Sequence, residues 1–154
     1  MQYQVRTARI TDAERIVTLL GSATSPVHMS GGVPRASGDL LRQLVDLPHA
    51  VVLVAESGRH LAGAAVLALR PSVRRGGFIG TIDILAADPA VEVVEVTDAL
   101  MSELLRSARN KGCVAVEAAP PEDPAERDRW IENGFGEAES RIVRDLAPAG
   151  ANRT

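Results

Sequence analysis

The sequence predicts an α/β (α+β) fold in which helices flank one central sheet. Extended patterns and amphipathic helical patterns alternate along the 154 residues, and no internal repeat or linker separates them. The clearest helical pattern repeats apolar side chains one turn apart, at Val96, Leu100, Leu104 and Ala108. With 45% apolar and 24% charged residues, the chain can bury a core as a single domain over residues 1–147. Residues 148–154 are expected to form a disordered tail.

Charge and cysteine content exclude several classes of protein. The net charge is −3 and no cluster of Lys or Arg is present, so we expect no nucleic acid and no anionic membrane as a partner. The longest apolar run, Leu61–Leu69, is less than half of a membrane span, and no signal-peptide pattern is visible. The single cysteine, Cys113, allows no internal disulfide and suits a reducing compartment, so we expect a cytoplasmic protein.

The first part of the chain predicts one strand and two helices. Alternating apolar residues over Tyr3–Ala8 indicate a strand. A capping box at Thr11-Asp12-Ala13-Glu14 predicts a helix that ends at Leu20. Ser37 is expected to cap a second helix, which Pro48 ends.

The middle of the chain predicts a hairpin, a further strand and a long helix. Two extended apolar runs, Ala50–Glu56 and Leu61–Arg70, flank the turn residues Ser57-Gly58-Arg59-His60 and predict an antiparallel hairpin. A third extended run, Phe78–Ala86, precedes the long helix. That helix ends at Lys111-Gly112, where a cation in the last turn is followed by a C-cap glycine.

The last part of the chain predicts a short buried strand and a capped helix. Val114–Ala118 has the composition of a buried strand. Asp123-Pro124-Ala125-Glu126 caps the last helix, with proline at its first position and glutamate at its third. Asn133-Gly134 ends this helix, and Phe135–Leu146 is expected to supply the final extended segment or segments.

Three motifs resemble those of the GNAT superfamily of N-acetyltransferases. Arg6–Ala13 reads Arg-x-Ala-x-x-x-Asp-Ala, and Asp88-Pro89 stands between a strand and the long helix. Trp130–Phe135 is similar to the family's Tyr-x-x-x-Gly-Phe. The predicted element order matches the family's order over nearly the whole chain. The resemblance implies a GNAT-type mixed, mostly antiparallel central sheet, and an N-acetyltransferase that uses acetyl-CoA.

The resemblance also implies which residues would hold acetyl-CoA. In the family, the strand before the Asp-Pro turn offers its backbone to the pantetheine arm, here at Leu85, Ala86 and Ala87. The turn then holds the pyrophosphate with backbone N–H groups at the helix N-terminus. The positions at and beside this turn are Glu92, Val93, Glu95, Thr97 and Asp98. Two positions of the last helix, Asp123 and Trp130, stand where the family has an asparagine and a tyrosine.

The residues at this turn differ from the family's in size and charge. Glu92 replaces an arginine, and Val93, Glu95 and Thr97 replace glycines. Side chains at these positions block the approach of a phosphate to the backbone, and carboxylates repel it. The loss of two charge-assisted hydrogen bonds, worth about 1.5–3 kcal/mol each, predicts that acetyl-CoA binding is weakened by about 10²–10⁴-fold.

Few residues are candidates for catalysis. Asp83 lies near the position where many family members place a glutamate that acts as base, although a single strand aspartate is more often solvated or salt-bridged. Trp130 stands in place of the tyrosine that often acts as acid, and an indole cannot act as a general acid near neutral pH. We therefore expect Trp130 to be buried against the sheet.

Two functions stay open on these residues. One is a CoA-dependent N-acyltransferase with an atypical phosphate loop, acting on a small-molecule or protein amine. The other is a non-catalytic protein of the same fold that binds a protein partner or a small ligand. By the resemblance, the connection Gly21–Ala36, which contains His28 and Met29, would line the acceptor pocket. The histidines are too widely spaced to predict a metal site, and exposed sheet edges would allow a homodimer.

Overall fold

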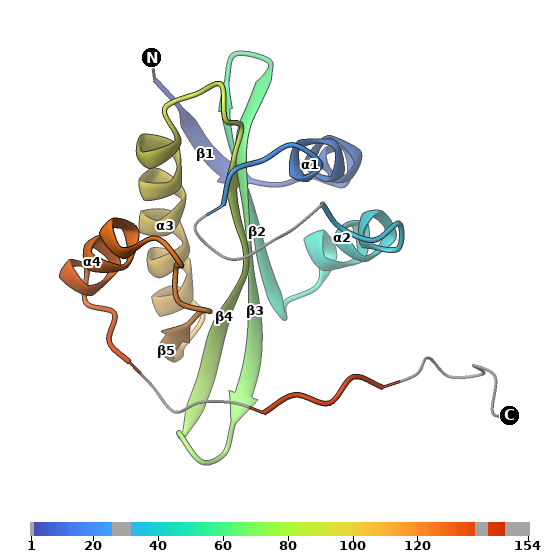
Figure 1. Cartoon of the computed structure of the whole chain (residues 1–154). Helices are drawn as coiled ribbons and strands as arrows, with labels where there is room; N and C mark the ends of the chain where they lie inside the picture. The colour runs from blue at the N-terminus through green and yellow to red at the C-terminus, as the bar shows by residue number, and fades with distance from the viewer. Residues whose placement is uncertain (1, 26–31, 138–141, 147–154) are drawn as a thin grey trace, which may run out of the picture.

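The computed structural model describes residues 2–25, 32–137 and 142–146 of the chain. Its elements follow the predicted order as far as the last helix (Figure 1). The strands are β1 (Gln4–Thr7), β2 (Ala50–Ser57), β3 (His60–Ser72), β4 (Gly77–Ala87) and β5 (Cys113–Glu117). The helices are the 3-10 turn η1 (Ile10–Asp12), α1 (Ala13–Leu20), α2 (Ser37–Asp46), α3 (Val93–Asn110) and α4 (Pro124–Glu132).

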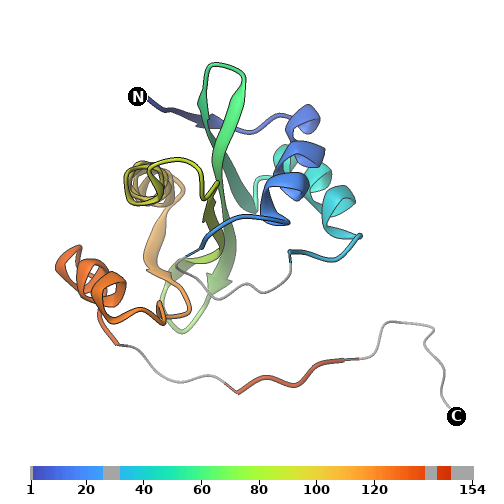
Figure 2. The same cartoon turned by 45° about the horizontal axis from the view of Figure 1, so that its top comes forward.

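In the described ranges, the strands form one five-stranded sheet in the order β1-β2-β3-β4-β5. Strands β1 to β4 pair antiparallel with one another, and β5 runs parallel to β4. The helices α1 and α2 cover one face of the sheet, while α3 and α4 lie on the other (Figure 1, Figure 2). This arrangement confirms the predicted α/β fold with a mixed, mostly antiparallel central sheet.

A hydrophobic core lies on each face of the sheet. The apolar residues repeated along α3 are all buried in the first core, as predicted: Val96, Leu100, Leu104 and Ala108. The second core contains Ile16 and Leu20 of α1 together with Leu41 of α2. Successive residues of a strand point to opposite faces, so Ala65 of β3 belongs to the first core and Ala64 to the second.

The helix α3 lies close to the sheet where β3 carries Gly63. A Cβ atom at this position would lie 2.7 Å from Val96 Cγ1 and 2.8 Å from the carbonyl oxygen of Ala86. Both distances are shorter than real Cβ contacts, so only glycine fits between β3 and the helix without a shift of the backbone. This close approach places the first turns of α3 directly beside the end of β4.

The first helix starts differently from the prediction. The carboxylate of Asp12 accepts a hydrogen bond from the Arg9 N–H at 2.7 Å, so the capping box begins at Arg9 rather than at Thr11. The guanidinium groups of Arg6 and Arg15 hold this carboxylate at 2.8 and 2.9 Å. The prediction failed because two arginines outside the box orient the Asp12 side chain.

The predicted side-chain cap is wrong for α2 and confirmed for α4. Ser37 is the first residue of α2 and not its cap, because its N–H is already bonded to the Pro34 carbonyl at 3.0 Å and Ala36 is the N-cap. The cap predicted for α4 is confirmed: Asp123 Oδ2 accepts from the Glu126 N–H at 3.2 Å. A side-chain cap is needed only where no turn satisfies the N–H groups at a helix start.

The C-terminal part differs most from the prediction. The strand β5 is half-buried rather than buried, and Val114 is 49% exposed. Residues 135–137 and 142–146 contain no strand, although an extended segment was expected there. Ile142, Val143 and Leu146 are exposed, and their segment stands apart from the helices and sheet (Figure 1, Figure 2). The apolar composition of Phe135–Leu146 predicts strands. A strand forms only where another strand can pair with it, and composition does not reveal such a partner. The predicted tail, residues 148–154, lies outside the described residues.

Candidate functional site

The second half of β4 has an edge without a strand neighbour in the described part of the chain. The first half pairs with β5, from Phe78 beside Cys113 to Thr81 beside Glu117. The strand β5 ends at Glu117, and residues 82–87 have only β3 as a strand neighbour. Residues 85–87, which would contact a pantetheine arm if the family resemblance holds there, therefore lie on a strand edge.

The connection between α1 and α2 covers this edge. The Thr24 N–H donates to the Ala87 carbonyl at 2.8 Å, and the Ala87 N–H donates to the Thr24 carbonyl at 2.9 Å. The Ser25 hydroxyl donates to the Leu85 carbonyl at 2.6 Å. Leu85, Ala86 and Ala87 are almost completely buried. Sequence reasoning missed Thr24 and Ser25, because two of the three bonds join backbone groups and leave no side-chain pattern.

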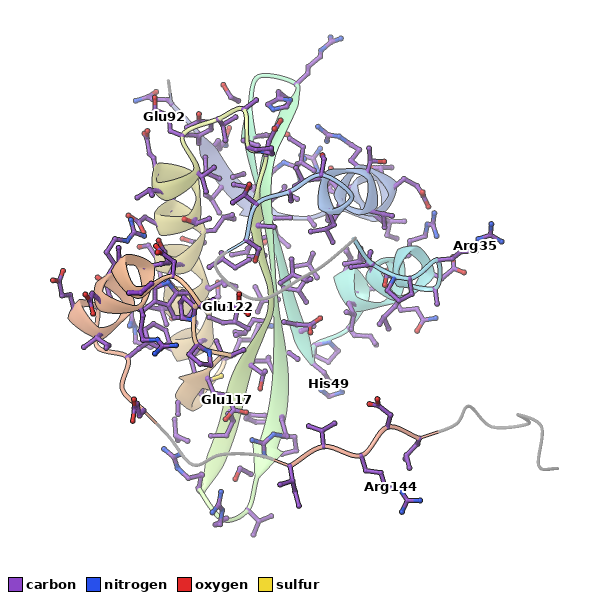
Figure 3. The ribbon with its side chains drawn as sticks, viewed as in Figure 1. Arg35, His49, Glu92, Glu117, Glu122 and Arg144 are labelled. Carbon is purple, nitrogen blue, oxygen red and sulfur yellow. The ribbon has the colours of Figure 1, made fainter. Side chains whose placement is uncertain are left out.

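The first turn of α3 carries residues larger than glycine, and two residues at this end are acidic. The helix begins at Val93 with the exposed Glu92 as its N-cap, and Figure 3 shows Glu92 at this end, far from Glu117 on β5. Glu95 is exposed, whereas Thr97 is buried and its hydroxyl donates to the Val93 carbonyl at 2.9 Å. Carboxylates at this end stabilise the helix dipole and oppose a bound anion. A pyrophosphate group at this helix start would therefore be opposed by the carboxylates of Glu92 and Glu95.

A small hollow separates α3 from α4, and its apolar lining consists of Leu85, Met101, Trp130 and Phe135. The rings of Trp130 and Phe135 lie 4.9 Å apart between centroids and are inclined by 44°. Trp130 is 7% exposed, so its predicted burial is confirmed. The remaining space is about 10 Å³, close to what one water molecule needs. The indole therefore fills the space between α4 and the sheet.

Polar residues close the mouth of this hollow. Arg129 Nη2 donates to Asp98 Oδ1 at 2.7 Å and to Glu126 Oε1 at 3.1 Å, which ties α4 to α3. Among the described residues, Arg129 Nε is the buried side-chain polar atom that lacks a hydrogen-bond partner. The i,i+3 spacing of Glu126 and Arg129 was the only sequence signal for this group.

Two other predicted site residues lie away from the hollow. Asp83 is exposed at a bulge of β4, between Ile82, which pairs with Leu67, and Ile84, which pairs with Val66. Asp123 is engaged as the cap of α4. The structure thus brings four of the predicted residues together at the hollow: Leu85, Thr97, Asp98 and Trp130.

Two further titratable side chains, His60 and Cys113, take part in contacts within the fold and lie away from the hollow. His60 Nε2 lies 2.9 Å from Asp88 Oδ2, and Asp88 Oδ1 accepts from the Ala90 N–H at 2.9 Å, which orders the turn before α3. Burial raises the pKa of the Cys113 thiol, so this side chain is a poor nucleophile at neutral pH. His28 lies outside the described residues. Within the described ranges, no group of three His, Cys, Asp or Glu side chains could hold a metal ion, and no helix is long and apolar enough to cross a membrane.

Comparison with solved structures gives extensive matches. An acetyltransferase of Trypanosoma brucei shares 21% identity at a TM-score of 0.73, with 94% of this chain and 100% of that chain covered. A transcriptional regulator of Bacillus halodurans shares 16% identity at 0.76, with the same coverage of 94% and 100%. Glucosamine-6-phosphate N-acetyltransferase of Arabidopsis thaliana shares 15% identity at 0.72, with 96% and 100% covered. No protein-family model matches the chain, and no curated protein matches it significantly. These likenesses confirm the GNAT-type fold.

Proposed function

We propose that this chain, which has the fold of N-acetyltransferases, acts by binding a protein partner and does not transfer acetyl groups. The hollow between α3 and α4 has room for about one water, which leaves no space there for a small organic ligand. A partner would therefore meet the outer surface of the molecule. A second copy of the chain, as in the homodimer that exposed sheet edges would allow, belongs to this class of partner.

One observation carries the proposal: the chain's own atoms fill two of the places that the resemblance assigns to acetyl-CoA, and carboxylates flank the third. Thr24 and Ser25 bond the edge of β4 where the pantetheine arm would lie. The exposed carboxylates of Glu92 and Glu95 lie at the helix start where pyrophosphate would bind. Trp130 fills the space between α4 and the sheet. The residues present do not fit acetyl-CoA, so we derive no acyl-transfer step.

Calorimetric titration with acetyl-CoA tests this proposal. The unmodified protein should give no heat or only millimolar binding, because carboxylates and side chains oppose the phosphates. The variant Glu92→Arg, Val93→Gly, Glu95→Gly, Thr97→Gly should bind about tenfold tighter or more, because it regains charge-assisted hydrogen bonds. Each added glycine in the helix should cost about 1 kcal/mol of stability.

A matched control separates charge from shape at the start of α3. The variant Glu92→Gln, Glu95→Gln removes both carboxylates and keeps the side-chain volume, so its affinity should rise less than that of the glycine variant. Micromolar binding of acetyl-CoA by the unmodified protein would refute the proposal.

A second candidate is an acyltransferase with an atypical phosphate loop that acts on a small-molecule or protein amine. The likeness to acetyltransferases over 94–96% of the chain favours it. Incubation with acetyl-CoA and a panel of primary amines, followed by mass spectrometry, distinguishes the two functions. Acetylated product that scales with protein concentration would support the acyltransferase, and its absence would support the binding protein.

A further inference from the structure

The edge of β4 at residues 82–87, which has no strand neighbour besides β3 among the described residues, has the hydrogen-bonding groups of an incomplete sheet. In an antiparallel pair, alternate residues direct their N–H and C=O groups to one neighbour and the intervening residues direct theirs to the other. Thr24 and Ser25 meet Leu85 and Ala87, whose groups therefore face away from β3. An extended chain that carries an amide group could pair with this edge as a further strand would.

We infer that Thr24 and Ser25 act as an intramolecular ligand of this edge and exclude extended amide-bearing ligands from it. This inference rests on the proposed function and deepens it, because it names the class of ligand that the contact excludes. The reciprocal bonds of 2.8 and 2.9 Å between Thr24 and Ala87 are those of one rung of an antiparallel ladder. The Ser25 hydroxyl then takes the next acceptor, Leu85 O, at 2.6 Å.

The position of this pair of residues follows from α1. The helix ends at Leu20, which is buried in the second core, and a turn bonds the Ser22 N–H to the Leu19 carbonyl at 3.1 Å. Ala23 packs against the same core. The helix α1 and the packing of Ala23 therefore direct Thr24 and Ser25 to β4, so the fold itself positions the contact.

The contact lies at the protein surface, so Thr24 and Ser25 compete with a ligand for β4 and are not part of a hydrophobic core. The Thr24 side chain is exposed and Ser25 is half-buried, and the bonds to β4 are made by two backbone groups and one hydroxyl. A ligand with an amide N–H and C=O could form equivalent bonds without opening either hydrophobic core. Binding of this ligand would first require the loss of the three hydrogen bonds that join Thr24 and Ser25 to β4.

Amide hydrogen exchange of the whole protein tests the contact. The Thr24 and Ala87 amides should be protected in the unmodified protein, and Ser25→Ala should speed their exchange by about 2- to 10-fold. The control is Ser22→Ala, which changes an exposed serine of the same connection and should leave both rates unchanged. An unprotected Ala87 amide, or equal effects of the two variants, would overturn the inference.

Titration with pantetheine tests the exclusion, because this probe carries the amide arm without phosphates and so avoids the acidic start of α3. The unmodified protein should not bind it, whereas the variant Thr24→Pro, Ser25→Ala, which lacks one N–H and one hydroxyl donor, should bind it at millimolar concentration. A short blocked peptide in a parallel titration shows whether any amide-bearing chain can bind or only this arm.

Three outcomes are informative beyond these. Equal binding of pantetheine by both proteins would overturn the exclusion, as would no binding by a double variant that remains folded and shows a deprotected Ala87 amide. Tight acetyl-CoA binding by an unmodified protein that does not bind pantetheine, and whose Ala87 amide is protected before any ligand is added, would refute the proposed function and support the contact. The two proposals therefore fail in different measurements.

Discussion

A buried carboxylate, Asp12, joins the first strand to the first helix. Its side chain is 2% exposed and accepts hydrogen bonds from Arg6 at 2.8 Å and from Arg15 at 2.9 Å. Arg6 also donates to Glu56 of β2 at 2.8 Å, so the network connects β1, η1, α1 and β2. A buried charge of this kind is costly without its partners, which makes each partner important for stability.

Replacement of Asp12 should destabilise the protein strongly. Asp12→Ala should lower the free energy of unfolding by about 3 kcal/mol, because it leaves Arg6 partly unpaired in a largely buried position. The control Asp39→Ala removes the exposed ion pair with Arg42 and should cost less than about 1 kcal/mol. Urea denaturation measures both values, and equal losses would contradict a special role for Asp12.

The same residue should make stability depend on acid pH. The hydrogen bond from Arg6 lowers the pKa of Asp12 from 3.8 to about 2. The stabilisation is fully present above the unfolded pKa, and it is lost as pH falls through the folded pKa, because the unfolded chain takes up the proton first. Unfolding free energies measured from pH 5 to about 2 should fall less steeply in Asp12→Asn. An unchanged slope would contradict this assignment.

At the scale of elements, two Asp-Pro pairs show how context decides a helix start. Asp123 caps α4 directly, and Pro124 is its first residue. Asp88 instead bonds the Ala90 N–H within a turn, and α3 begins only at Val93. The same dipeptide therefore starts one helix at once and delays the other.

The Asp123 cap gives a prediction for α4. Asp123→Ala should cost about 1 kcal/mol of stability, because the Glu126 N–H loses its acceptor, and Asp123→Ser should restore most of the loss. Thermal unfolding followed by circular dichroism measures both variants. A serine variant as unstable as the alanine variant would show that Asp123 acts in some other way.

At the scale of the whole molecule, side-chain periodicity predicted more than any single motif did. The apolar positions of α3 and the burial of Trp130 could be predicted because each depends on what the side chain itself prefers. The bridge between Thr24 and Ala87 could not, because backbone groups far apart in sequence make it. The Asp98–Arg129 pair was also missed, since it depends on how α4 packs against α3.

The order of strands in the sheet has a consequence for folding kinetics. The three central strands β2, β3 and β4 follow one another in sequence as well as in space, so their pairing closes only short loops. β1 and β5 are each joined to this central meander through helices and close longer loops. We therefore expect the meander to be the folding nucleus, because its pairing loses the least loop-closure entropy. Substitutions in either outer strand should chiefly speed unfolding and leave the refolding rate nearly unchanged.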